Sequence, residues 1–169
     1  MKLTRTVSLV VLLAGLSVLA GWAYRIDWLT HLVPDGPRMV PLTATGFVLA
    51  ALAVWLGDGW VAKACAALVI VAGTLGLVSR MLGWTLHVAP IALPVGSMAV
   101  ASAVAFASIG GALLLSRNAR GKGAFQFFSI VTVLAGCVGL SRFLYGGEPL
   151  VPYADMGVQS GLLFFEIGF

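Results

Sequence analysis

The sequence predicts an all-α integral membrane protein with six transmembrane helices, arranged as three repeated helical hairpins with the N-terminus inside. The first observation is composition: 60% of the 169 residues are hydrophobic, only 9% are charged, and the mean hydropathy is +1.05. This apolar content exceeds what a soluble domain of this length can use in its core. The second observation is an internal repeat, which predicts that one structural unit occurs three times.

The repeat is read from three methionines that lie 59 and 58 residues apart, each followed by a small or hydroxyl-bearing pair and then a Phe. The three copies are Met39, Thr43, Ala44 and Phe47; Met98, Ser102, Ala103 and Phe106; and Met156, Ser160, Gly161 and Phe164. The Thr and Ser hydroxyls are expected to bond back to a carbonyl of their own helix or across to a neighbour. We expect one membrane domain over 1–169, with repeat units of about 6–57, 62–116 and 124–169.

Six apolar stretches supply the predicted helices, at 6–24, 39–57, 62–79, 95–116, 124–141 and 156–169. The first five approach the ~20 residues that a helix needs to cross the hydrocarbon core. The sixth would rise only about 21 Å and would leave the terminal carboxylate of Phe169 in the bilayer, where a charge is costly. We therefore expect the chain to be the N-terminal part of a longer one.

The first stretch follows a basic start and also fits a secretory signal peptide. Cleavage would remove the first helix of the first repeat unit, so the repeat favours its retention. After it, prolines at 34, 37 and 41 interrupt the helix, so the chain is expected to turn and re-enter near Met39.

Basic residues set the orientation under the positive-inside rule. An inside N-terminus places six cations on the inner side: Lys2, Arg5, Lys63, Arg117, Arg120 and Lys122. It also places four of the six acidic residues outside. This predicts a multi-pass membrane protein with the lipid bilayer as its partner. Topology alone explains the basic loop, so no nucleic-acid partner is expected.

The candidate ligand-binding residues lie at the outer ends of the three hairpins. An Arg at such a place can snorkel to lipid phosphates. Three equivalent Args that converge could instead bind an unknown small anionic or carbonyl-bearing ligand on the outer side. The candidates are Arg25, Trp28 and His31; Arg80, Trp84 and His87; and Arg142, Tyr145 and Glu148.

Other chemistry has little support in the sequence. Cys65 and Cys137 both fall in apolar stretches and are expected to be small buried residues without a disulfide. His31 and His87 could ligate haem, but they lie at the outer boundary instead of at helix centres, so no metal or cofactor is expected. Glu166 falls in the sixth apolar stretch and is a functional candidate if it lies at membrane depth. No catalytic motif is present, so no catalytic residue is assigned and enzyme status stays open.

The helix starts MVPLTATGF from Met39, MAVASAVAF from Met98 and MGVQSGLLF from Met156 carry a family resemblance. Together they resemble the N-terminal multi-helix membrane regions of bacterial sensor histidine kinases and diguanylate cyclases. The resemblance implies a multi-pass sensory input domain in the bacterial inner (cytoplasmic) membrane. Such a domain would read an outer-side or lipid-borne signal and relay it to a cytoplasmic output domain, a kinase or cyclase, absent from this segment.

Two other functions stay open. The alternative is a small six-helix transporter or substrate-binding membrane subunit, and a haem-binding membrane protein ranks third. A small-residue stripe at Ala99, Ala103, Ala107 and Gly111 predicts close helix packing and leaves a homodimer contact open.

Overall fold

The computed structural model describes residues 2–30, 38–57, 59–82, 98–115, 122–144 and 160–164. These residues form helices with short connections and no strand, which confirms the all-α prediction. The helices are α1 (Lys2–Tyr24), α2 (Asp27–Thr30), α3 (Pro41–Leu56), α4 (Trp60–Leu82), α5 (Val100–Leu115) and α6 (Lys122–Leu144). Residues 160–164 form a further helical segment.

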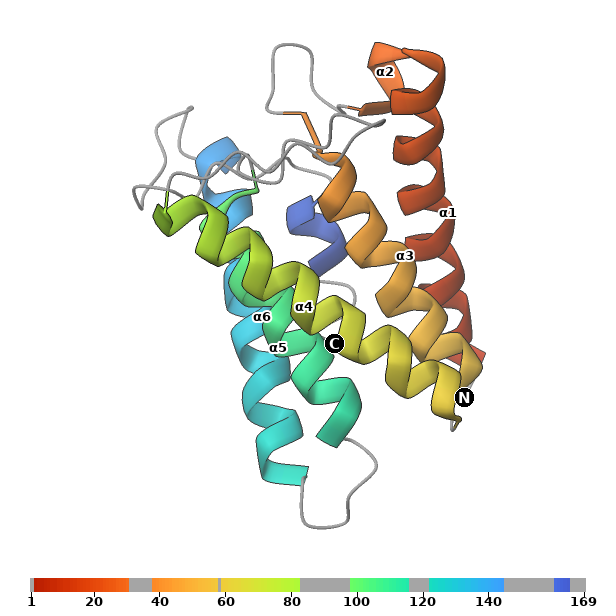
Figure 1. The fold of residues 1–169 in the computed structure, drawn as a ribbon, viewed down its shortest axis with the longest axis vertical. Coiled ribbons are helices and arrows are strands. Elements are labelled where there is room, and N and C mark those ends of the chain that lie inside the picture. Colours follow the sequence, from red (N-terminus) through yellow and green to blue (C-terminus); the bar gives the residue numbers. More distant parts are fainter. Residues whose placement is uncertain are drawn as a thin grey trace.

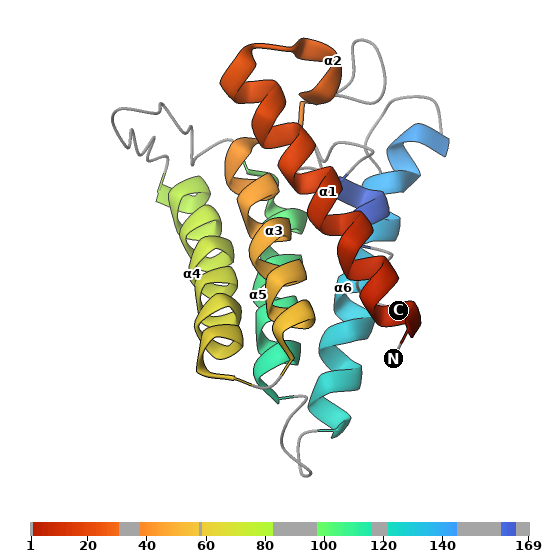
Figure 2. The same ribbon diagram turned by 90° about the vertical axis from the view of Figure 1, so that its right-hand side faces the viewer.

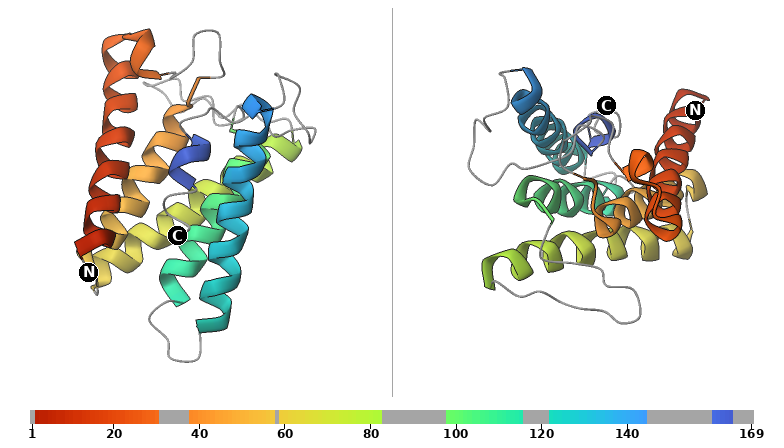
Figure 3. Two further views of the ribbon diagram at one scale, coloured as in Figure 1. Left: turned by 180° about the vertical axis from the view of Figure 1, so that it is seen from behind. Right: turned by 90° about the horizontal axis from the view of Figure 1, so that it is seen from above.

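The helices form an inner group and an outer group. Seen from above, α1, α4 and α6 surround α3, α5 and the short segment 160–164 (Figure 3). α1 packs on α3, α4 packs on α5, and the pairs α3–α4 and α5–α6 are also in contact. α3 and α5 run in the same direction, opposite to α1, α4 and α6 (Figures 1 and 2). The inner helices therefore begin at the end of the bundle where the outer helices finish.

Proline and backbone conformation set two helix boundaries. α3 begins at Pro41, where a missing N–H costs nothing because the first turn has no intrahelical acceptor for it. α1 ends where Arg25 takes a left-handed conformation with φ 55°. The Ile26 N–H then donates to the Gly21 carbonyl over 2.7 Å, which closes the helix as a Schellman turn.

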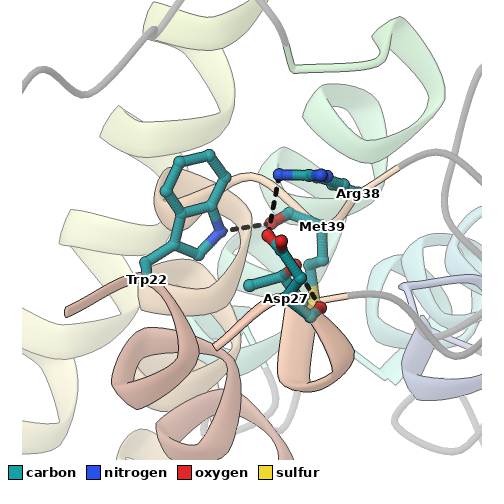
Figure 4. Close-up of polar contacts among 5 residues, drawn as sticks. Trp22, Asp27, Arg38 and Met39 are labelled. Carbon is teal, nitrogen blue, oxygen red and sulfur yellow. Dashed lines mark hydrogen bonds and ion pairs between the residues drawn. The ribbon is translucent and has the colours of Figure 1, made fainter. Parts of the chain in front are cut away.

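The connection after α1 contains the short helix α2, within a stretch that the sequence analysis treated as a loop. The Trp22 indole Nε1 donates to the Met39 carbonyl over 2.9 Å, and the Met39 N–H donates to the Thr30 carbonyl over 2.9 Å. Asp27 and Arg38 form an ion pair of 3.0 Å (Figure 4). Both partners are mostly exposed, so the pair stabilises the connection by less than about 1 kcal/mol, and the Trp22 bond is the firmer link between α1 and the start of α3.

Two helices are long and apolar enough to cross a membrane, within Arg5–Tyr24 and Trp60–Leu82. α3 and α5 have 16 residues each, a rise of about 24 Å against the ~30 Å of a hydrocarbon core. Membrane-spanning character at the other predicted stretches, and the inside N-terminus, therefore stay predictions.

Glycines in the outer helices allow close approach to the inner ones. A Cβ added at Gly15 in α1 would lie 3.1 Å from the Ala44 carbonyl oxygen. A Cβ at Gly73 in α4 would lie 2.7 Å from the Ala103 carbonyl oxygen. Ala44 and Ala103 hold the same place in the repeat, so α1 meets α3 where α4 meets α5. This confirms the packing role of the stripe that contains Ala103.

Candidate functional site

The centre of the molecule is built from the residues that define the repeat. Met39, Thr43 and Phe47 follow each other at four-residue intervals on one face of α3 and its N-terminal extension, and all three are buried. Met98, Ser102 and Phe106 do the same on α5. Ser160 and Phe164 are buried in the short third segment. The repeat therefore marks the inward faces of the inner helices.

Three phenylalanine rings from the three copies meet at this centre. Phe47, Phe106 and Phe164 are each 0% exposed, and their ring centroids lie 4.6–4.9 Å apart. Two of the pairs are edge-to-face, a favoured geometry for aromatic rings. We call these three residues the Phe triad. The sequence analysis recognised them as equivalent but did not place them in contact.

Glycine in α3 makes room for this arrangement. A Cβ added at Gly46 would lie 2.8 Å from two ring atoms of Phe106, closer than side-chain carbons approach in proteins. The Phe106 ring therefore lies directly against the α3 backbone. This contact joins α3 to α5.

One helical turn before each Phe lies a buried hydroxyl. Thr43, Ser102 and Ser160 are 3%, 2% and 2% exposed. None of the three hydroxyls forms a hydrogen bond with another residue in the described ranges, whereas the Thr45 hydroxyl donates to the Pro41 carbonyl over 2.9 Å. We call these three residues the hydroxyl layer. The sequence analysis favoured a structural use of these hydroxyls through bonds to their own or a neighbouring helix, and no such bond is formed in the described part of the chain.

Four of the nine candidate ligand-binding residues fall in described helices or turns. Arg25 and Trp28 are exposed beside and within α2, and Arg80 is exposed in the last turn of α4. Arg142 lies near the end of α6. The ends of α1, α4 and α6 lie on different sides of the bundle in Figure 3, so the described helices do not gather these positions around one point. His31, Trp84, His87, Tyr145 and Glu148 lie outside the described residues. A ligand site at the outer ends stays a prediction.

The outward faces of the outer helices are covered by large apolar side chains. They are Leu9, Val10, Leu13 and Leu16 on α1; Leu68, Val71, Leu75 and Val78 on α4; and Phe127, Ile130 and Leu134 on α6. The inward faces are dominated by Ala, Gly, Ser and Thr, with the Phe triad between them. Larger aliphatic residues are thus common on the exposed faces of the described helices, and small residues outnumber them on the buried faces.

Both cysteines are free, as predicted. Cys65 is buried, but Cys137 is exposed on α6, so the expectation that both are buried is wrong for Cys137. The residues within the described ranges hold no group of three or more His, Cys, Asp or Glu side chains that could bind a metal. Glu166 lies outside these ranges.

Comparison of this chain with protein-family models, with curated proteins and with solved structures finds no match.

Proposed function

We propose that this chain is a multi-pass, membrane-embedded input domain of a bacterial signal-transduction protein in the inner membrane. The observation that supports membrane embedding is where side chains of different size lie. Large apolar side chains are exposed on the outer helices, whereas Ala, Gly, Ser and Thr dominate the buried faces. Many exposed Leu, Val, Ile and Phe side chains along three helices are unfavourable in water but match lipid tails. Membrane helices associate through small residues because lipid supplies no hydrophobic drive between them.

The two long apolar helices support the same conclusion. Their most apolar windows, within Arg5–Tyr24 and Trp60–Leu82, are only 28% and 33% buried inside the protein. A core helix of a soluble protein is mostly buried, and a signal sequence would explain only the first helix. A lipid environment accounts for both helices at once.

Three hairpins around a pseudo-threefold axis complete the proposed architecture. The first pairs α1 with α3, and the second pairs α4 with α5. The third pairs α6 with segment 160–164, where a Cβ added at Gly161 would lie 3.3 Å from the Gly136 carbonyl oxygen. The support is the Phe triad, in which equivalent residues from all three copies contact each other. A second support is that Gly15 and Gly73 approach equivalent positions of the inner helices.

The packed centre favours an input domain over the transporter alternative. A transporter carries its substrate through a site near the bilayer midplane. Here the Phe triad fills the axis between the inner helices with rings in van der Waals contact. A closely packed centre of this kind would let the helices move together, so that a displacement of one helix is transmitted across the membrane to a cytoplasmic output domain. The resemblance of the helix starts at Met39, Met98 and Met156 to those of sensor kinases and cyclases supports the same proposal.

Spin-label accessibility tests the membrane part. In a Cys65→Ala/Cys137→Ala background, single cysteines replace Leu13 on α1 and Leu75 on α4, both on the apolar surface. After reconstitution, labels at both sites should collide often with oxygen, which is lipid-soluble, and rarely with a water-soluble nickel chelate. The matched control is Gly123 at the start of α6, where nothing surrounds an added Cβ. High chelate accessibility at Leu13 and Leu75 would refute membrane embedding.

The signalling part is tested in the natural gene product. The coding sequence past codon 169 is read for a kinase or cyclase module, and Arg80→Ala is assayed for its output. We expect altered output with normal insertion because Arg80 occupies the outer end of α4. Absence of an output module, or unchanged output from a normally expressed variant, would count against the input-domain role.

A further inference from the structure

One end of the bundle carries exposed aromatic and basic side chains. It is the end where α1, α4 and α6 begin and where α3 finishes (Figures 1 and 2). Trp60, the first residue of α4, is 81% exposed, and Trp55 in the last turn of α3 is 47% exposed. Arg5 in α1 and Lys63 in the first turn of α4 are exposed as well. We call these four residues the basic–aromatic surface.

The packing of α1 against α3 places Arg5 at the same end as Trp55. The two helices run in opposite directions, and a Cβ added at Gly15 would lie 2.8 Å from a side-chain carbon of Val48. Arg5 precedes Gly15 by ten residues, a rise of about 15 Å from this contact. Trp55 follows Val48 by seven residues, a rise of about 10 Å in the same direction.

The connection between α3 and α4 is open around its glycines. A Cβ added at Gly57 or Gly59 would meet no atom within 4 Å. Trp60 and Lys63 are three residues apart, so their side chains are neighbours on one side of α4. An indole and an ammonium group therefore lie beside a turn whose backbone a head group can approach.

The polar groups of the basic–aromatic surface can only donate hydrogen bonds, because indole, guanidinium and ammonium groups have no acceptor. None of the four side chains forms a hydrogen bond or ion pair within the described ranges. At the opposite end, comparable groups are paired: the Trp22 indole donates to the Met39 carbonyl, and Arg38 forms an ion pair with Asp27. The partner of the basic–aromatic surface must therefore supply acceptors.

Charge in the segments that meet at this end is strongly positive. The sequence adds Lys2 at the start of α1, Lys122 at the start of α6, and Arg117 and Arg120 between α5 and α6. Against these stands one acidic residue, Asp58, between α3 and α4. This balance favours an anionic partner.

We propose that the basic–aromatic surface binds the phosphate head group of an anionic phospholipid. Lys and Arg pair with phosphate oxygens, and an indole donates to a head group while its ring lies at the level between lipid tails and water. Leu56 and Val61, 47% and 40% exposed, adjoin the two Trp residues in the sequence and offer contact to the acyl chains. A soluble anion would satisfy the donors but leave these apolar side chains in water, so a lipid fits the surface better.

This inference rests on the membrane part of the proposed function. The spin labels at Leu13 and Leu75 report embedding in any lipid, whereas the experiment below compares two lipids with the same acyl chains. A protein that is embedded but does not distinguish the two lipids would contradict this inference alone.

Lipid-dependent thermal stability tests the surface. The full chain in neutral detergent is titrated with dioleoyl-phosphatidylglycerol, which is anionic, or with dioleoyl-phosphatidylcholine, which has no net charge. A ligand that binds only the folded state raises the melting temperature, by about 5–10 °C at 100 times its dissociation constant. Phosphatidylglycerol should give the larger shift, and added salt should reduce the difference between the lipids, because the cations are exposed.

Lys63→Gln and Arg5→Gln each remove one cation from the surface. Each should weaken the apparent affinity for phosphatidylglycerol about fivefold, the effect of one basic residue near an anionic lipid surface, and leave that for phosphatidylcholine unchanged. Trp60→Ala should weaken the binding of both lipids, because the phosphate and the acyl chains are common to them.

Arg38→Gln is the matched control. It makes the same change of charge at the opposite end of the bundle, where Arg38 is paired with Asp27. This variant should keep the full preference for phosphatidylglycerol. Equal shifts with the two lipids, or the same loss in Arg38→Gln as in Lys63→Gln, would overturn the proposal.

Sodium glycerol phosphate, a head group without acyl chains, distinguishes a lipid from a free phosphate. It should give little shift, and a shift as large as that of phosphatidylglycerol would overturn a lipid as the occupant. Unchanged binding of both lipids to Trp60→Ala would do the same. If Lys63→Gln does not fold, the comparison of Arg5→Gln with Arg38→Gln decides.

Discussion

Replacement of Gly73 by Ala tests the close contact between α4 and α5. The new Cβ would lie 2.7 Å from the Ala103 carbonyl oxygen and 2.8 Å from the Ala107 nitrogen. Both neighbours are backbone atoms of α5, so they cannot move aside as a flexible side chain can. Overpacking of this kind costs typically 1–3 kcal/mol. Ala gains up to about 1 kcal/mol over Gly in helix propensity, so we expect a net loss of about 1–2 kcal/mol.

Gly123→Ala is the matched control, since no atom lies within 4 Å of a Cβ at this exposed position of α6. It should gain up to about 1 kcal/mol from helix propensity alone. The assay is thermal unfolding in detergent followed by far-UV circular dichroism, where each kcal/mol shifts the midpoint by about 2–4 °C for a chain of this size. Equal melting temperatures for the two variants would refute the close approach of α4 to the α5 backbone.

Three further substitutions or labels address the core, the end of α1 and the two cysteines. Phe106→Ala should lower the free energy of unfolding by about 3–5 kcal/mol, because it removes one ring of the Phe triad. The control Phe127→Ala, on the exposed face of α6, should change the melting temperature little. Similar losses of stability in the two variants would contradict the packing of the Phe triad. Arg25→Gly should raise the melting temperature by a few degrees, because a left-handed residue other than Gly costs about 1 kcal/mol. A melting temperature below that of the wild type would argue against the left-handed conformation of Arg25. An apolar maleimide should label Cys137 faster than Cys65 in detergent, as judged by mass spectrometry, and the reverse order would contradict the burial of Cys65.

Helix positions followed well from the sequence. The predicted stretch 62–79 falls within α4 (Trp60–Leu82), and 124–141 falls within α6 (Lys122–Leu144). Apolar runs without interruption predict helices because a membrane leaves backbone groups no other partner. The boundaries shifted where local chemistry acts over one or two residues. Pro41 places the start of α3 two residues later than predicted, and the Schellman turn at Arg25 separates α1 from the unexpected helix α2.

The central site was only partly predictable. The spacing from Met39 to Phe47 recurs in all three copies, so the equivalence of Thr43, Ser102 and Ser160 was visible in the sequence. Their lack of hydrogen-bond partners was not visible, because a Ser or Thr in a helix commonly bonds to a carbonyl three or four residues earlier. Whether it does so depends on the side-chain rotamer and on the space that neighbouring helices leave.

The sequence by itself determined the helices, their apolar character and the threefold recurrence of one residue pattern. It could not determine which face of α3 or α5 lies inside, because both helices are apolar on all sides and carry little periodicity. Only the tertiary structure decided this, through the fit of side-chain sizes. Gly15 and Gly73 admit the backbones of the inner helices, Gly46 admits the ring of Phe106, and the three Phe side chains fill the space that remains. Where helices expose large apolar side chains as well as burying apolar ones, steric fit between helices selects the buried face.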